Sequence, residues 1–295
     1  MKTLIVIAGP TASGKTAFSI ALAKALDTVI ISADSRQFYK EMSIGTAAPT
    51  LEELSQAKHF FVHNINIQDK YDVAEYEKNV LALLKTLFQE HDSVILTGGS
   101  GLFIDAVCNG IDAMPDIALE TREKVERLYR EGGLKALQES VQQLDPEYFS
   151  IVDKQNPRRL QRALEVCLQT EKTFTSFRQR QTAPRNFKII KFALLWDRET
   201  LNQRIDLRVD LMMKQGLLEE ARSLYPMRHL NALNTVGYKE LFAYFDGNCT
   251  LKKAVEQIKI HTHQYAKRQM TWLHKDDSYI WVKTDEMEKV LNHIR

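Results

Sequence analysis

One loop constrains the fold of this chain more than any other feature of its sequence. A largely apolar run at residues 2–8 predicts a buried β-strand, and Gly-Pro-Thr-Ala-Ser-Gly-Lys-Thr follows at 9–16. This is the pattern G-x-x-x-x-G-K-T of a P-loop, and residues 17–26 have the periodicity of the helix that must follow it. Together they predict a P-loop NTPase-like α/β fold, a parallel sheet flanked by helices.

The chemistry of the P-loop indicates bound phosphate. Gly9 and Gly14 allow the backbone to bend so that successive N–H groups point inward, and the following helix adds its positive end. Lys15 would reach the phosphate oxygens, and the Thr16 hydroxyl would ligate a bridging Mg²⁺. The alternative is a glycine-rich turn that merely closes a strand–helix unit. The candidate diphosphate-binding residues are Gly9, Pro10, Thr11, Ala12, Ser13, Gly14, Lys15 and Thr16.

A polar segment follows the second predicted strand, residues 28–33. Because the carboxyl ends of parallel strands meet at one edge of a sheet, we expect Asp34 to stand beside the phosphate loop. Its carboxylate is a candidate Mg²⁺ ligand, general base or helix N-cap. The next three residues, Ser35, Arg36 and Gln37, could hydrogen-bond the edges of a nucleobase.

A third buried strand is predicted at residues 93–97, and it ends in Gly98-Gly99-Ser100. The glycines permit close backbone approach to a ligand, and Ser100 offers a hydroxyl at the start of a helix. No acidic residue follows this strand, so a Walker-B aspartate is missing, which argues against an ATPase. Between the second and third of these strands we expect a helix at 51–56, a strand at 59–63 and a helix at 72–89.

Residues 111–185 change character and predict a helical insertion into an α/β core formed by residues 1–110 and 186–295. The helices are expected at residues 119–129, 134–144 and 160–168. Cations with interleaved aromatic rings are typical of nucleic-acid binding, and the alternative is a solvated helix face with two phenylalanines in the core. The second half carries this mixture: Arg158, Arg159, Arg162, Lys172, Arg178, Arg180 and Arg185, with Phe174 and Phe177.

The core resumes with a strand at residues 188–196 and a long helix. Arg204 and Arg208 are four residues apart, so they share a helical face that could grip an anion, while Asp206 and Asp210 could pair with them on the surface. A helix at 250–275, a strand at 279–282 and a short helix complete the pattern. The 250–275 helix also carries the basic residues Lys267 and Arg268.

The composition is that of an ordinary globular protein, with 44% hydrophobic and 26% charged residues. Its three cysteines, Cys108, Cys167 and Cys249, are too widely spaced for a metal pair or a disulfide framework. The chain shows neither a cleavable apolar leader nor a membrane-length run, so we expect a soluble cytoplasmic protein without membrane contact. Because the net charge is only +2, any nucleic-acid footprint must come from local clustering.

Taken together, the motifs resemble those of the tRNA dimethylallyltransferases, over nearly the whole chain. The resemblance implies transfer of a dimethylallyl group from dimethylallyl diphosphate to N6 of adenosine 37, beside the anticodon, by a monomer that binds the anticodon stem-loop and uses Mg²⁺. The segments that carry it are GPTASGKT at 9–16, DSRQFY at 34–39, GTAAP at 45–49, GGSGLF at 98–103, NPRRLQRALE at 156–165, RIDLRVD at 204–210 and QYAKRQMTW at 264–272.

The resemblance also implies roles for individual residues. Asp34 would take the proton from N6, and Ser100 would hydrogen-bond the oxygen of the scissile C–O bond. Lys15, Mg²⁺ and Arg208 would stabilise the departing diphosphate. The implied tRNA contacts are Asp34, Ser35, Arg36, Gln37, Ser100, Arg122, Arg158, Arg159, Leu160, Gln161, Arg162, Lys267 and Arg268.

The chain departs from the family pattern at three positions. Ala48 stands where the family usually has Lys, Ser100 where it has Thr, and His263 where it has Arg. Three other functions compete with the one implied: prenyl transfer to free AMP or ADP, phosphoryl transfer by a small-molecule kinase, and an RNA-binding module with a vestigial loop. The basic insertion favours RNA over a free nucleotide.

Overall fold

The computed structural model describes residues 1–179 and 183–294 and divides into two compact units. One unit comprises Met1–Cys108 and Arg185–Arg295, and the other comprises Asn109–Pro184, against residues 111–185 expected for the insertion. Arg180, one of the expected basic residues, lies outside the described part. No helix among the described residues is both long and apolar enough to cross a membrane.

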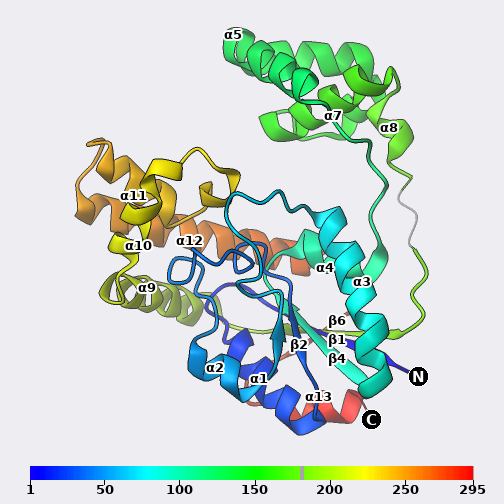
Figure 1. Ribbon diagram of the computed structural model, residues 1–295, viewed down its shortest axis with the longest axis vertical. Helices are drawn as coiled ribbons and strands as arrows, with labels where there is room; N and C mark the ends of the chain where they lie inside the picture. Colours follow the sequence, from blue (N-terminus) through cyan, green and yellow to red (C-terminus); the bar gives the residue numbers. More distant parts are fainter. Residues whose placement is uncertain (180–182, 295) are drawn as a thin grey trace. The chain divides into compact units, whose positions relative to one another are not determined.

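The first unit is built on a six-stranded parallel sheet (Figure 1) with the strand order β3-β2-β4-β1-β5-β6. The first strand, β1, pairs with β4 on one side and with β5 on the other, so that Ile5 lies between Ile95 and Ile190. A parallel sheet flanked by helices confirms the predicted fold class. The strands are β1 (Thr3–Ala8), β2 (Ile30–Ser32), β3 (His59–Phe60), β4 (Ser93–Gly98), β5 (Lys188–Leu194) and β6 (Tyr279–Val282).

Helices cover both faces of this sheet (Figure 1). Alternate residues of β1 enter the two cores, Leu4 and Val6 on one face and Ile5 and Ile7 on the other, as the period of a strand requires. The helices of this unit are α1 (Lys15–Leu26), α2 (Leu51–Gln56), α3 (Val73–Glu90), α4 (Gly101–Asn109), α9 (Arg198–Lys214), α10 (Leu217–Leu224), α11 (Tyr238–Phe245), α12 (Leu251–Leu273) and α13 (Met287–Ile294), with 3₁₀ turns η1 (Tyr225–Met227) and η2 (Asn231–Leu233).

Strand ends differ from the expected ones where the backbone leaves the extended region. β3 has only two residues instead of the five expected at 59–63, because Phe61 and His63 have φ angles of 60° and 50°. β2 is three residues long, and β5 ends at Leu194 rather than at Trp196.

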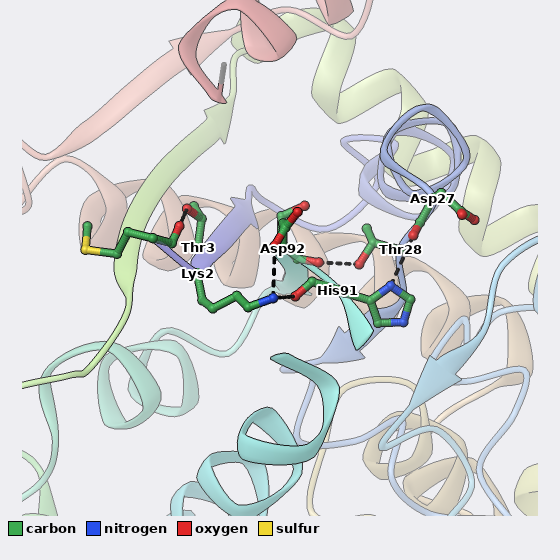
Figure 2. A network of polar contacts seen from close by, with 8 residues as sticks. Lys2, Thr3, Asp27, Thr28, His91 and Asp92 are labelled. Carbon is green, nitrogen blue, oxygen red and sulfur yellow. Dashed lines mark hydrogen bonds and ion pairs between the residues drawn. The ribbon is translucent and has the colours of Figure 1, made fainter. Parts of the chain in front are cut away.

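A polar network connects the strands at their amino-terminal ends (Figure 2). Lys2 Nζ donates to the His91 carbonyl at 3.0 Å and to Asp92 Oδ1 at 2.9 Å, which ties the start of β1 to the start of β4. His91 Nδ1 contacts the Asp27 carbonyl at 3.1 Å, and the Thr28 hydroxyl donates to the Ser93 carbonyl. These contacts are structural, and the predicted functional residues follow the strands at the opposite, carboxyl edge.

The second unit is helical, with α5 (Leu119–Leu144), α6 (Pro146–Ile151), α7 (Pro157–Thr170) and α8 (Phe174–Phe177). α5 breaks at Gly133, whose φ is 64°, so it consists of the two helical segments expected from the sequence. Phe174 and Phe177 pack into the apolar core of this unit, which corrects their interpretation as base-stacking rings. Leu160 is also fully buried there, so its side chain cannot contact RNA, contrary to the expectation.

Candidate active site

The P-loop connects β1 to α1 and is closed by its own lysine. Lys15 Nζ donates to the carbonyl oxygens of Gly9 at 2.9 Å and of Pro10 at 2.7 Å. Gly14, just before α1, has a φ of 86°, which favours glycine. Trp196 Nε1 donates to the Ser13 carbonyl at 2.9 Å, and Ser13 Oγ is buried with no partner among the described residues.

Two arginines of α9 reach the same loop. Arg208 Nη1 lies 3.5 Å from Thr11 Oγ1, and Arg204 Nε donates to the Ala12 carbonyl at 2.8 Å. The Arg204 guanidinium also lies 4.4 Å from the centroid of the Trp196 ring. Both arginines line the cavity together with Asp34. Arg204 braces the loop through the Ala12 carbonyl, whereas burial lowers the pKa of Arg208 and Asp34 is close enough for its carboxylate to oppose this effect.

The expected pairing of Asp206 and Asp210 with these arginines is wrong. Asp206 Oδ1 lies 2.9 Å from His263 Nε2, and Asp210 Oδ1 lies 2.7 Å from Lys259 Nζ. Both partners belong to α12, because α9 packs against that helix. His263 thus links α12 to α9.

Asp34 follows β2 and enters a turn instead of a helix, so the N-cap alternative is excluded. Its Oδ1 accepts a hydrogen bond from the Arg36 backbone N–H at 3.1 Å, and its own N–H donates to Ser32 Oγ at 3.3 Å. This Asx-type contact orients the carboxylate. Within the described residues, Oδ2 has no hydrogen-bond partner.

Ser100 holds the segment that carries Asp34. The Ser35 backbone N–H donates to Ser100 Oγ at 3.0 Å, and Ser100 Oγ donates to Ser35 Oγ at 3.2 Å. The Ser100 backbone N–H donates to the Ala33 carbonyl at 3.2 Å. The hydroxyl for which the family resemblance implied a contact to the scissile bond is therefore engaged with Ser35.

Arg36 and Gln37 line the cavity, but their polar groups bind protein. Arg36 Nη1 donates to the carbonyls of Asn231 and Ala232, both at 3.1 Å. Gln37 Nε2 donates to the Thr46 carbonyl at 3.3 Å and to the Ala47 carbonyl at 3.1 Å. These contacts position the cavity wall, a role that the sequence did not reveal.

A cavity of about 940 Å³ within the first unit is lined by many of the predicted residues, although Gly9, Pro10, Ser35 and Ser100 are not among them. The P-loop forms one part of its wall, Asp34 another and Arg208 a third. Ala48 also lines it, so the position where the resemblance led us to expect lysine presents only a methyl group to the cavity. The expectation that Asp34 stands beside the phosphate loop agrees with this geometry.

The charges in the cavity are coupled. Burial, and to a smaller extent the Arg208 cation, lowers the pKa of Lys15 to about 7, and the Asp34 carboxylate acts in the opposite direction. Burial also lowers the pKa of Arg208, again opposed by Asp34. The positive charges of Lys15 and Arg208 thus repel each other in the cavity, and a bound anion would offset this repulsion.

Two residues of α12 belong to the site and were not identified from the sequence. Gln269 Oε1 accepts from the Thr11 backbone N–H at 2.8 Å, and its Nε2 donates to the Gly99 carbonyl at 2.9 Å. Tyr265 lines the cavity one turn earlier. Burial raises the pKa of Tyr265, Asp34 raises it further, and Arg36 and the Ser100 hydroxyl lower it. The i, i+4 spacing of Tyr265 and Gln269 was the available signal.

The remaining predicted RNA contacts are surface positions. Lys267 and Arg268 are exposed on α12, and the Arg268 guanidinium lies 5.8 Å from the centroid of the Tyr265 ring. Exposed positions in the second unit are Arg122, Arg158 and Arg159, while Gln161 and Arg162 are partly buried. Arg162 also pairs loosely with Glu165, at 3.7 Å.

Comparisons with known proteins converge on one family. A family model described as IPP transferase matches residues 37–276. The chain is 51% identical over 292 residues to tRNA dimethylallyltransferase 1 of Phocaeicola vulgatus, covering 99% of this chain and 97% of that protein.

Solved structures give the same result. The tRNA isopentenylpyrophosphate transferase of Bacillus halodurans superposes with a TM-score of 0.74 at 30% identity, covering 100% of this chain and 96% of that one. A eukaryotic dimethylallyltransferase acting on tRNA superposes with a TM-score of 0.79 at 22% identity, covering 98% of this chain and 75% of that one, which extends the likeness of fold.

Proposed function

Because this chain belongs to the IPP transferase family of tRNA dimethylallyltransferases, we propose that its cavity is where the dimethylallyl group passes to adenosine 37 of tRNA. The chain is accordingly a prenyltransferase of tRNA processing. The observation that carries the assignment of the site is that the Asp34 carboxylate and the P-loop line one cavity. The diphosphate of the donor would lie on the loop, and N6 of the adenine would face Asp34.

The donor side of the site has the groups that a diphosphate needs. The loop N–H groups and the Lys15 ammonium would hold its oxygens, with Lys15 exchanging its contacts to Gly9 and Pro10 for contacts to phosphate. Arg208 lines the same cavity and would neutralise charge that grows as the C–O bond breaks. Because the anion would offset the repulsion between Lys15 and Arg208, this repulsion favours its binding.

The residues present fit Mg²⁺ as a companion of the diphosphate. No group of three His, Cys, Asp or Glu side chains among the described residues could hold a metal by itself. Mg²⁺ usually keeps several waters and takes one or two protein ligands together with phosphate oxygens, which suits the Thr16 hydroxyl on the cavity wall. When bound, Mg²⁺ supplies charge neutralisation of the leaving group.

The acceptor side removes one proton. As the bond between N6 and the first carbon of the prenyl group forms, the C–O bond to diphosphate breaks and its electron pair leaves with the diphosphate. The N6 proton passes to Asp34, whose Oδ2 has no other partner among the described residues. Ser100 supports this step by holding Ser35 and the Asp34 segment.

The nucleic-acid side rests on exposed cations. The bases in an anticodon loop are easier to extrude than those in a duplex, so the target adenine can enter a cavity at a cost of only a few kcal/mol. Arg122, Arg158 and Arg159 of the second unit, with Lys267 and Arg268 of α12, would bind phosphates of the anticodon arm.

One experiment tests the proposed substrates. The purified chain is incubated with dimethylallyl diphosphate, Mg²⁺ and tRNA that lacks the modification, and the nucleosides are then analysed by mass spectrometry. We expect adenosine 37 to gain one dimethylallyl group. Parallel reactions with AMP or ADP as acceptor, and with ATP as donor, should give no product. Prenylated AMP, or phosphoryl transfer, would contradict the proposal.

A further inference from the structure

Gln269 is a buried side chain that joins two separate parts of the site. Only 7% of its surface is exposed, and both ends of its amide are used, towards Thr11 and towards Gly99. A Cβ atom at Gly99 would lie 2.3 Å from Gln269 Nε2, so this approach requires glycine. One amide thus connects the donor loop directly to the end of β4.

The end of β4 in turn holds the segment that carries Asp34. A Cβ atom at Gly98 would lie 2.3 Å from the Ala33 carbonyl oxygen, which shows how closely β4 and the end of β2 approach. Two residues later, Ser100 Oγ accepts a hydrogen bond from the Ser35 backbone N–H. A short chain of contacts therefore runs from Thr11 through Gln269 to the Asp34 segment.

Helix α12 provides a rigid base for this link. One face of the helix lines the cavity, through Ile258, Thr262, Tyr265 and Gln269. Just beyond Gln269, Trp272 packs against Gly101, where a Cβ atom would lie 2.3 Å from the indole, and donates to Asp105 Oδ2 at 3.0 Å. The position of Gln269 along the cavity is therefore fixed by packing as well as by hydrogen bonds.

We propose that Gln269 is a positioning residue that sets the separation between the donor loop and the Asp34 segment, so that N6 rather than water captures the prenyl carbon. This inference rests on the proposed function. A displacement of about 1 Å at a reacting centre can cost a factor on the order of 100 in rate. When the acceptor is misplaced, the allylic diphosphate can be hydrolysed instead. Water then attacks the prenyl carbon, the C–O bond breaks, and dimethylallyl alcohol, diphosphate and a proton are formed.

The test counts diphosphate released for each adenosine prenylated, at saturating donor and tRNA. Gln269→Met keeps a similar volume and no charge but loses both hydrogen bonds. Gln264→Met is the matched control, because Gln264 is exposed on the same helix. We expect a ratio near one for the wild type and for Gln264→Met. For Gln269→Met we expect a ratio of about three or more, with kcat at least about tenfold lower.

Two outcomes overturn the inference. One is a ratio near one for Gln269→Met with kcat within about twofold of the wild type. The other is a ratio near one with kcat and diphosphate affinity reduced together, which would make Gln269 a donor-binding residue only. A wild type that forms no prenylated adenosine would instead refute the proposed function.

A second variant guards against misfolding of Gln269→Met, which circular dichroism and the melting temperature would reveal. Gly99→Ala disrupts the same hydrogen bond from the other side, because its Cβ atom would displace the Gln269 amide, and it leaves residue 269 itself a glutamine. We expect the same excess of diphosphate from Gly99→Ala. If that variant is folded and its ratio stays near one, Gln269 does not set the separation.

Discussion

Lys15 Nζ lies 2.7 Å from the carbonyl oxygen of Pro10, so the cation that a P-loop directs at phosphate here closes its own loop. The same ammonium shares the cavity with Arg208, which helps to lower its pKa to about 7. The affinity for an anion should therefore depend on whether Lys15 carries its proton, and that dependence falls in a range that is easily measured.

Diphosphate binding should weaken as the pH rises above about 7. An anion favours charged Lys15 and raises its pKa, so binding takes up a proton once the free enzyme has lost it. The dissociation constant of inorganic diphosphate, measured by calorimetry, should rise between pH 7 and 9, approaching about tenfold per unit. Below pH 7 Lys15 is already charged in the free enzyme, so its ionisation no longer changes the dissociation constant.

The control for this prediction is Lys15→Met, which lacks the titrating group. It should bind diphosphate more weakly at every pH, and its remaining pH dependence reports the ionisation of diphosphate itself. Equal slopes for Lys15→Met and the wild type would show that Lys15 does not titrate in this range.

Thr16→Val should raise the Mg²⁺ concentration needed for half-maximal activity. The variant keeps the shape of the side chain but removes the hydroxyl that we assign to the metal, and the diphosphate would retain its other contacts. We expect an increase of about tenfold, the value of a lost interaction of roughly 1.4 kcal/mol. The titration is done at saturating donor and tRNA. An unchanged Mg²⁺ requirement would remove Thr16 from the metal site.

Tyr265→Phe should slow prenyl transfer without weakening donor binding. The phenol lines the cavity with Asp34, and burial and the Asp34 carboxylate both raise its pKa, whereas the P-loop is held by Gln269 one turn away. Removal of this hydroxyl from the cavity, at about the free energy of one hydrogen bond, predicts a decrease of about fivefold to tenfold in the single-turnover rate. Diphosphate affinity should stay within about twofold. A parallel loss of affinity and rate would show that Tyr265 acts on the donor side.

Arg158→Ala combined with Arg159→Ala should weaken tRNA binding and reduce its salt dependence. If both arginines contact phosphates, the slope of log Kd against log salt should fall by about one for each. Filter binding over a range of salt concentrations measures this slope. Lys135→Ala is a suitable control, since Lys135 is an exposed residue of the same unit to which we assign no RNA contact. An unchanged slope in the double variant would place the RNA elsewhere.

Sequence motifs located the parts of the site that depend on local order. The P-loop pattern and the apolar runs are short-range signals, and parallel strands bring their carboxyl ends to one edge, so the position of Asp34 beside the loop followed. The extents of α2, α3 and α12 also followed closely from periodicity, and the predicted strand at 279–282 matches β6. The short helices α6, α8 and α10 were not predicted.

Contacts between distant helices could not be predicted in the same way. Periodicity shows which residues share a face of α9, but the partners of Asp206 and Asp210 depend on packing against α12, some fifty residues later. Gln269 was missed for the same reason, because a glutamine on a helix surface is usually solvated and only the fold buries it. Phe174 shows the converse, since a ring next to arginines proved to be core.

The central claim is that Asp34 takes the proton from the acceptor while the P-loop holds the donor. Asp34→Asn is nearly isosteric and cannot act as a base, and its effect is measured as the single-turnover rate of adenosine 37 prenylation by mass spectrometry, beside the diphosphate affinity of the same protein. We predict a rate lower by about 100-fold to 10,000-fold with affinity within about threefold of the wild type. A rate within about threefold of the wild type would contradict the account.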